Sequence, residues 1–287
     1  RIMILIVESG ATKTDWCLCA GRPGDDGHQC RKFRTAGFNA ATMDAGSLCR
    51  MIEEIPSNFG CSCADRISEI YFYAAGLVSE TPPPALVSAF SGHFRNASVM
   101  EFASDLIAAA RALFGDSEGV AAIMGTGSNS CLYDGSSVVK CYRPGGFVLG
   151  DEGSAASLGR MFLADYFKEL VPRSLASEFS RAFPDVTYAS AVHNIYKGEK
   201  PSAYMASFAP FVTMHLDEPY AASLVENNVR AFIERSLSRY GCKRVGVCGS
   251  FGIACREVIE KAGASFGFEF TDFIQAPIDR LVYYHSK

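Results

Sequence analysis

One plan that occurs twice constrains this sequence most: an apolar run, a turn of glycine and hydroxyl residues, and a second apolar run. In the first half, residues 4–7 lead through Glu8 into the turn at 9–12, and apolar residues 16–20 follow. In the second half, residues 119–124 lead into 125–129, and 130–133 follow. Such runs are typical of buried strands joined as hairpins. The repetition predicts an internal duplication, with two lobes facing each other across a cleft.

The remaining segments alternate strand and helix patterns. We expect further strands at 29–34, 67–75, 97–102, 138–142 and 243–248. We expect helices at 43–56, ending before Pro56, and at 84–91, 105–114, 253–262 and from Pro277 onward, with 155–240 mostly helical. This order predicts the α/β class, with a mixed sheet and flanking helices in each half. The predicted lobes are residues 1–114 and 115–287, the second with a helical insertion and a last helix that could return to the first lobe.

Composition excludes several classes of protein. The chain has 287 residues, 48% hydrophobic and 20% charged, as in a globular protein with a sizeable core. A net charge of −4 gives no reason to expect a nucleic-acid partner. No apolar run has the length of a membrane span, and no signal peptide precedes the first strand, so we expect no membrane partner and a cytoplasmic location.

The sequence contains eleven cysteines but no Cys-x-x-Cys motif. Cys17 and Cys19 are separated by one residue, as are Cys61 and Cys63, a spacing that we assign to two faces of a strand or turn. We therefore expect free buried thiols in a reducing compartment, and no zinc knuckle. The five histidines show no metal-binding spacing, and we expect them on the surface or in packing.

Both turns have the chemistry of an anion site. In the first turn, Gly10 and Ala11 let backbone N–H groups approach a phosphate, while Thr12 and Lys13 add a hydroxyl and a cation. It is not a Walker loop, which needs a longer glycine spacing and a following helix. The alternative for either turn is an ordinary polar hairpin. Two such tips in one chain favour phosphate binding.

The second turn, with Thr126 and Gly127, also resembles the start of a dinucleotide fingerprint. Ser130 stands where the third glycine is required, and no helix follows, so we reject that interpretation. Gly249 and Ser250 follow a late apolar run. They either seat an adenine ring or supply the small residues that a helix N-terminus needs.

Three other kinds of polar residue are candidates for chemistry. Glu8, at a strand end, offers a hard oxygen ligand for hydrated Mg²⁺. Asp105 and Asp151 each lie near the start of a helix, where aspartate is either a helix cap or a functional carboxylate. Asn39 either hydrogen-bonds a substrate or occupies a turn.

Four motifs, at 9–15, 125–129, 150–154 and 249–251, occur in this order along nearly the whole chain. They resemble the phosphate-1, phosphate-2, sugar-contacting and adenosine motifs of the N-acetylglucosamine kinase branch of the BadF/BadG/BcrA/BcrD ATPase family. That family belongs to the actin/hexokinase/Hsp70 superfamily. The resemblance implies a two-lobed actin-like (ribonuclease H-like) ATPase fold. It also implies an ATP-dependent kinase that phosphorylates an amino sugar, with N-acetylglucosamine and O6 expected and glucosamine or N-acetylmuramic acid left open.

The resemblance also implies roles for single residues, with ATP and Mg²⁺ as cofactors and a small-molecule sugar as partner. Asp105 is expected to be the catalytic base and Glu8 to serve the metal. Nucleotide contacts are expected from Gly10, Ala11, Thr12, Lys13, Thr126, Gly127, Gly249 and Ser250, and sugar contacts from Asn39, Asp105, Asn129, Gly146 and Asp151.

The sequence departs from the family at two positions. Glu8 stands where the family usually has aspartate, and Phe147 stands where animal members have tryptophan. The resemblance leaves two other functions open: an activator ATPase, which would need cysteines for a bridging iron–sulfur cluster, and a nucleotide sensor without turnover. It leaves the oligomeric state open, a homodimer included.

Overall fold

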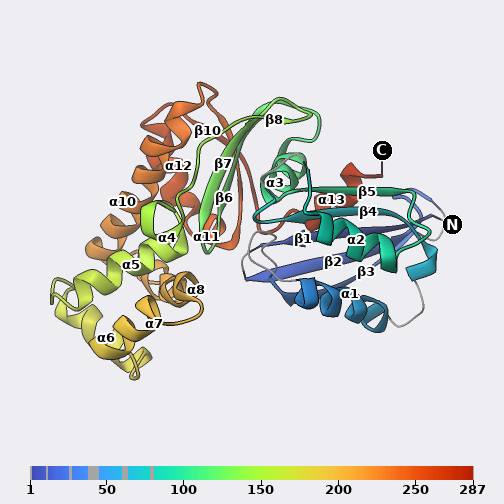
Figure 1. The fold of residues 1–287 in the computed structure, drawn as a ribbon. Coiled ribbons are helices and arrows are strands. Elements are labelled where there is room, and N and C mark those ends of the chain that lie inside the picture. Colours follow the sequence, from blue (N-terminus) through green and yellow to red (C-terminus); the bar gives the residue numbers. More distant parts are fainter. Residues whose placement is uncertain are drawn as a thin grey trace. The chain divides into compact units, whose positions relative to one another are not determined.

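The computed structural model describes residues 2–10, 12–25, 28–37, 45–59, 64–77 and 81–286. The chain divides into two compact units, one of residues 1–116 with 276–287 and the other of residues 117–275 (Figure 1). Each unit contains a five-stranded mixed sheet with helices against it, which confirms the predicted α/β class.

The sheet of the first unit has the order β3-β2-β1-β4-β5. Strands β1 (Met3–Ser9), β2 (Lys13–Ala20) and β3 (Gln29–Ala36) form the expected antiparallel meander, and β4 (Ile67–Ala74) and β5 (Val99–Ser104) continue it in parallel with β1. The helices of this unit are α1 (Ala45–Phe59), α2 (Pro84–His93), α3 (Asp105–Phe114) and α13 (Ile278–Tyr284), with a short 3-10 turn at Ala64–Arg66.

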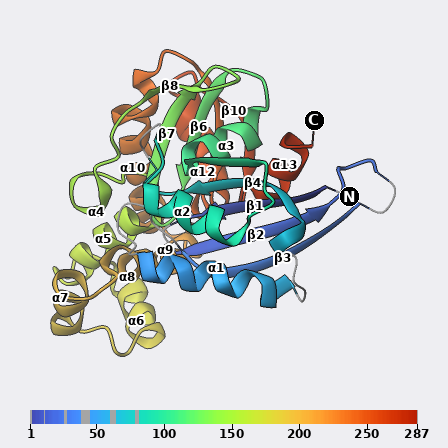
Figure 2. The same cartoon turned by 45° about the vertical axis from the view of Figure 1, so that its right-hand side comes forward.

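Alternation along β1 explains why both faces of this sheet are covered. Successive side chains of a strand point to opposite faces, so a strand that is apolar at every position must be buried on both. Leu5 and Val7 pack in one cluster with residues of α1 and α2, while Ile4 and Ile6 pack in another with residues of α3 and α13 (Figure 2). The unit is therefore a sheet between two helical layers.

The second unit repeats this plan. Its strands are β6 (Gly119–Met124), β7 (Ser128–Tyr133), β8 (Val138–Cys141), β9 (Arg244–Cys248) and β10 (Glu269–Ile274), in the order β8-β7-β6-β9-β10. If the strands are numbered in chain order within each unit, both sheets have the spatial order third, second, first, fourth, fifth. Pairing is antiparallel among the first three strands and parallel in the rest, as in the first unit. This identity of topology agrees with the duplication expected from the hairpins.

The expected helical stretch at 155–240 is confirmed, and its helices pack on one face of the second sheet. Val120, Ala122 and Met124 of β6 share a large core cluster with residues of α5, α10 and α12. The helices of this unit are α4 (Gly146–Leu149), α5 (Ala155–Tyr166), α6 (Arg173–Ala182), α7 (Tyr188–Tyr196), α8 (Pro201–Ala206), α9 (Ala209–Thr213), α10 (Pro219–Arg235), α11 (Ser250–Ala254) and α12 (Arg256–Ala264), with a 3-10 turn at Leu237–Arg239.

Three elements differ from the sequence-based expectation. Strand β10 was not expected, because Glu269 and Asp272 interrupt its apolar pattern at the sheet edge. Helix α1 continues past residue 56 to Phe59, whose side chain is 2% exposed, so tertiary packing outweighs the cost of a proline inside the helix. The helix expected at 253–262 is two helices, α11 and α12, that meet at Cys255.

The expectation that the cysteines are all free thiols is wrong. Cys19 of β2 lies directly opposite Cys30 of β3, and the two form a disulfide. Cys17 and Cys19 lie on one face of β2 rather than on two, because residues two apart in a strand point the same way. Seven other cysteines within the described residues take part in no disulfide. Register across strands decides the pairing, and spacing along the sequence does not reveal it.

Candidate functional site

In the first unit, three carboxylates lie at the end of the sheet where its parallel strands finish. Glu8 precedes the last residue of β1, and Asp105 follows the last residue of β5. Asp15 of β2 is paired with Glu8 across the hairpin. The carboxyl ends of parallel strands share one edge of a sheet, and ligands of open α/β sheets bind there.

Burial raises the pKa values of two of these groups, and repulsion from its neighbours adds to the shift of Glu8. Glu8 is 8% exposed, and burial, followed by the negative charges of Asp105 and Asp15, raises its pKa to about 8 against the opposing charges of Lys13 and Arg34. Burial raises the pKa of Asp105 to about 6, against hydrogen bonds from the backbone N–H groups of Leu106 and Asp105 itself. The residue as a whole is only half-buried, so the desolvation concerns the carboxyl group and part of the residue remains accessible.

Asp105 does not cap its helix. Ser104 occupies the N-cap position of α3, and its hydroxyl accepts a hydrogen bond from the Ile107 N–H at 3.3 Å. The helix therefore has its cap already, and Asp105 is the first residue within it. Asp105 is therefore not the N-cap residue, although its carboxylate accepts hydrogen bonds from N–H groups of the first turn, and it remains a candidate base.

Two cations accompany this acidic edge. Arg34 Nε of β3 lies 2.7 Å from Asp15 Oδ1, and Lys13 Nζ lies 3.4 Å from Asp15 Oδ2. Sequence reasoning gave Asp15 and Arg34 no role. The signal that would have found them is the register of the meander, in which Asp15 faces Glu8 on one side and Arg34 on the other.

The turn between β1 and β2 is closed by its own hydrogen bonds. The Gly10 N–H donates to the Lys13 carbonyl at 2.9 Å. The hydroxyls of Ser9 and Thr14 lie 2.6 Å apart, and Thr14 donates to the Ala36 carbonyl. Thr12, by contrast, is exposed at the tip, and a Cβ added at Gly10 would meet only the Lys13 oxygen, at 3.9 Å. Ala11 and Asn39, two predicted contact residues, lie outside the described residues.

In the second unit, the turn after β6 rests on the start of α5. The Ala155 and Ala156 N–H groups donate to the carbonyls of Gly125 and Thr126, and the Ser128 hydroxyl donates to the Glu152 carbonyl at 2.6 Å. Ser154 is the N-cap of α5. The two sequence motifs at 125–129 and 150–154 are thus one structural feature.

Asp151 belongs to this feature. It is 8% exposed and has a φ of 58°, a left-handed conformation that is uncommon outside glycine. A Cβ added at Gly127 would lie 3.0 Å from Asp151 Oδ2, so this carboxylate lies directly against the turn. Burial raises the Asp151 pKa, the Ser128 N–H lowers it, and the Glu152 charge raises it. The structure brings a predicted sugar contact against a predicted phosphate turn.

The predicted adenosine motif also lies at this turn. The Gly249 N–H donates to the Ile274 carbonyl, and Gly249 has a φ of 130°. A Cβ there would lie 2.3 Å from the Met124 carbonyl oxygen. Gly249 and Ser250 therefore sit beside the end of β6, and only glycine fits at residue 249.

The two remaining predicted sugar contacts lie nearby in sequence. Asn129 of β7 accepts a hydrogen bond from the Ser130 N–H through its side-chain oxygen, at 2.9 Å. Gly146 begins α4 with a φ of 67° and open space where a Cβ would be. The adjacent side chains of Val148 and Leu149 are 74% and 79% exposed, so this short helix presents an apolar surface.

Comparison with solved structures places this arrangement among sugar kinases. A candidate N-acetylglucosamine kinase from Porphyromonas gingivalis is 36% identical, covers 99% of each chain and superposes with a TM-score of 0.91. Another from Chromobacterium violaceum is 18% identical over 99% of this chain and 98% of that one, with a TM-score of 0.71. A ROK family glucokinase from Streptomyces griseus, solved with glucose and AMPPNP, shares the fold: 14% identity, 98% and 97% coverage, TM-score 0.57.

Other comparisons give no match: no family model and no curated protein matches the chain. Within the described residues, none of the helices combines the length and the apolar character that crossing a membrane requires.

Proposed function

The chain belongs to the N-acetylglucosamine kinase family of the actin/hexokinase superfamily, and from that premise we propose that it transfers the γ-phosphoryl group of ATP to a hydroxyl of an amino sugar. N-acetylglucosamine is the proposed acceptor and O6 the proposed hydroxyl. The observation that carries this proposal is the Asp105 carboxylate, which is desolvated, lies outside the N-cap position of its helix and is adjacent to a second buried carboxyl, Glu8.

Asp105 is suited to accept the proton of the sugar hydroxyl. A general base works best when its pKa lies near the working pH, because it must be ionised and still bind a proton. With a pKa of about 6, Asp105 is mostly ionised at neutral pH and more basic than an ordinary aspartate. Phosphoryl transfer depends chiefly on positioning and on neutralising charge, so the base contributes one factor among several.

The residues around Glu8 fit a divalent cation. Glu8 is buried beside Asp105 and Asp15, and like charges so close are stable only if a proton or a cation neutralises them. Carboxylate oxygens are the ligands that Mg²⁺ takes in nucleotide sites, usually with several waters retained. Glu8 would hold the ion, with Asp15 and Asp105 as neighbours. The bound ion would neutralise charge on the phosphates of ATP.

The two turns are proposed to bind the nucleotide. Gly10, Thr12 and Lys13 would contact the β- and γ-phosphates, and Thr126 and Gly127 would contact phosphate as well. Gly249 and Ser250 would lie against adenosine. The contact between Asp151 and Gly127 supports a second task for Asp151, in addition to binding sugar: it holds the second turn in place.

An ADP-release assay with a panel of sugars tests this function. The panel should contain N-acetylglucosamine, glucosamine, N-acetylmuramic acid and glucose, and we expect the highest kcat/KM for N-acetylglucosamine. Mass spectrometry and NMR of the product then identify the phosphorylated oxygen, and the 6-deoxy sugar should not react. ATP binding without sugar-stimulated ADP release would instead indicate a nucleotide sensor. A brown protein with an iron–sulfur spectrum would indicate an activator ATPase.

A further inference from the structure

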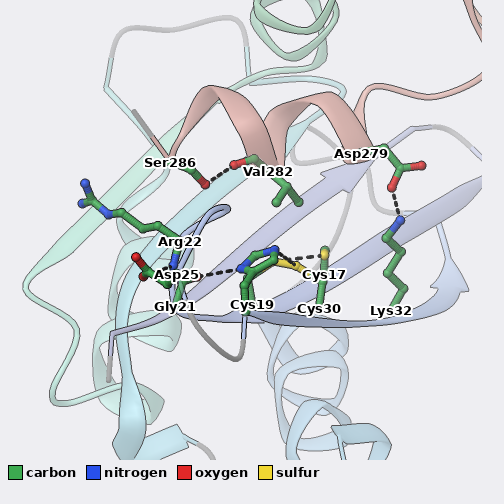
Figure 3. Close-up of a disulfide and its surroundings, with 11 residues drawn as sticks. Cys17, Cys19, Gly21, Arg22, Asp25, Cys30, Lys32, Asp279, Val282 and Ser286 are labelled. Carbon is green, nitrogen blue, oxygen red and sulfur yellow. Dashed lines mark hydrogen bonds and ion pairs between the residues drawn. A yellow bond between two sulfur atoms is a disulfide. The ribbon is translucent and has the colours of Figure 1, made fainter.

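Three sulfur atoms cluster on one face of the first sheet, beginning two residues along β2 from Asp15. Cys17 and Cys19 of β2 project from the same face, and Cys30 of β3 is opposite Cys19 (Figure 3). The Cys17 and Cys19 sulfurs are 3.6 Å apart, and the three sulfurs all lie within 4.8 Å of one another. Such a concentration of soft donor atoms is what a thiophilic metal ion requires.

A histidine lies beside one member of the cluster, Cys30. The Nδ1 atom of His28 lies 3.2 Å from the Gly21 carbonyl oxygen, and its Nε2 atom lies 3.5 Å from the Cys30 sulfur. A carbonyl only accepts, so the proton is on Nδ1, and the lone pair of Nε2 points toward Cys30. Metal-binding histidines are held in this way, with one nitrogen donating to a backbone carbonyl and the other free for the ion.

Two of the spacings match those of tetrahedral coordination. Zinc bonds of about 2.3 Å to sulfur and about 2.0 Å to nitrogen place two sulfurs about 3.8 Å apart, and a sulfur and a nitrogen about 3.5 Å apart. The Cys17–Cys19 and Cys30–His28 contacts, at 3.6 and 3.5 Å, have these lengths. The sulfurs of Cys19 and Cys30 are closer together than these lengths because a disulfide joins them.

An ion can enter from the side of β3. Cys17 and Cys19 are 0% and 1% exposed and pack against Leu281 and Val282 of α13, whereas Cys30 and His28 are half-buried. Lys32, also on β3, is ion-paired with Asp279 and adds positive charge near the thiols. Three thiolates and one divalent ion carry a net charge of −1, and the positive charge of this lysine would stabilise it.

We propose that the reduced protein binds one zinc-like ion through the thiolates of Cys17, Cys19 and Cys30 and through Nε2 of His28, and that the Cys19–Cys30 disulfide is the ion-free form of the same site. A dithiol reductant converts the disulfide form into the form that binds the ion. It gives two electrons and two protons to the disulfide and becomes a disulfide itself, leaving thiols at Cys19 and Cys30. The ion then displaces three thiol protons, one from each cysteine, and His28 binds it together with Cys30 once the disulfide has opened.

Proton release makes the affinity depend on pH. Because the ion competes with protons, we expect tighter zinc binding at pH 8 than at pH 6.

The test is a zinc titration of the whole chain. The protein is reduced with dithiothreitol, freed of it under anaerobic conditions, and titrated with Zn²⁺ against a chromophoric chelator. We expect one tightly bound ion per chain, and with Co²⁺ the absorption bands of a tetrahedral thiolate complex. Protein kept in the disulfide form should lose this binding.

Variants assign the ion to this cluster. Cys30→Ser and His28→Ala change half-buried residues, so these variants should fold, and each should weaken zinc binding by about tenfold or more. The matched control is Cys49→Ser, which removes an exposed free thiol of α1 and should leave zinc affinity unchanged. The proposal is overturned if the reduced protein binds no zinc, if the disulfide form binds it equally well, or if Cys30→Ser and His28→Ala both bind like the original chain.

Discussion

At the scale of single residues, Asp105 gives the sharpest test of the proposed chemistry. Replacing it by asparagine keeps its size but removes the base, so we expect kcat to fall by about 10²–10⁴-fold with ATP affinity nearly unchanged. Because Ser104 caps α3, the melting temperature should change little. The matched control is Ser104→Ala, which should cost about 1 kcal/mol of stability. A stable and fully active Asp105→Asn protein would end the catalytic assignment.

The same residue predicts a pH profile. With the pKa of Asp105 raised to about 6, activity should rise with pH through a midpoint near 6, above the range of an ordinary aspartate. Because Asp105 and Glu8 interact, the midpoint belongs to the pair. Measuring kcat/KM from pH 4.5 to 8 under saturating Mg²⁺ tests this expectation. A kcat/KM that does not fall toward pH 4.5 would contradict it.

Glu8 predicts how stability depends on pH in metal-free protein. Its folded-state pKa of about 8 exceeds the value of 4.5 expected on unfolding, so the folded state binds the proton more tightly. The stabilisation that this proton on Glu8 provides is therefore fully present below pH 4.5, and it is lost as pH rises through about 8. Glu8→Gln should remove this loss and be more stable than the original chain at pH 8.5 without metal.

Mg²⁺ supplies the control for that comparison. It should stabilise the original chain at pH 8.5 more than the Glu8→Gln variant, as measured by urea unfolding with and without the ion. Equal stabilisation of both proteins would show that Glu8 does not serve the metal. Glu8→Asp should still respond to the ion.

Sequence predicted part of this residue set. Glu8 could be selected because it directly follows an apolar run, and Asp105 because it lies at the start of a predicted helix. Asp15 and Arg34 could not, because their proximity to Glu8 depends on cross-strand register. The Cys19–Cys30 disulfide was missed for the same reason.

At the scale of elements, Gly249 fixes how β9 joins α11. Its φ is 130°, and a Cβ there would lie 2.3 Å from the Met124 carbonyl oxygen, so other residues do not fit. Gly249→Ala should therefore destabilise the protein by about 1–3 kcal/mol and weaken ATP binding. Gly92→Ala, in α2 with open space around it, should be neutral or stabilising by up to about 1 kcal/mol. Urea unfolding and nucleotide titration measure both, and equal effects of the two substitutions would contradict this account.

Element types could be predicted from the sequence where a segment contains an unbroken apolar run, as residues 3–7 of β1 do, or begins with a clear cap, as α3 does. Prediction failed where tertiary contacts decide. Strand β10 is a polar-interrupted edge strand that exists because β9 offers it a partner, and α1 is prolonged by the burial of Phe59. Local sequence does not contain those contacts.

At the scale of the whole molecule, two units with one sheet topology support the duplication seen in the sequence. That both turns contact one ligand stays a prediction. If they do, an ATP analogue with N-acetylglucosamine should reduce the radius of gyration in solution scattering, and the analogue alone should have a smaller effect. An unchanged radius with both ligands bound would count against a shared site.

The first unit is discontinuous in sequence, since α13 lies at its sheet although the whole second unit, Ser117–Gln275, precedes that helix. Ile4 and Ile6 leave the ribosome long before Ile278 and Leu281, the residues against which they pack. During synthesis one side of the first sheet is therefore covered by α3 but lacks α13 while the whole second unit is made. The nascent chain would expose apolar surface throughout that interval, and chaperones that recognise such surfaces would have their longest opportunity to bind it then.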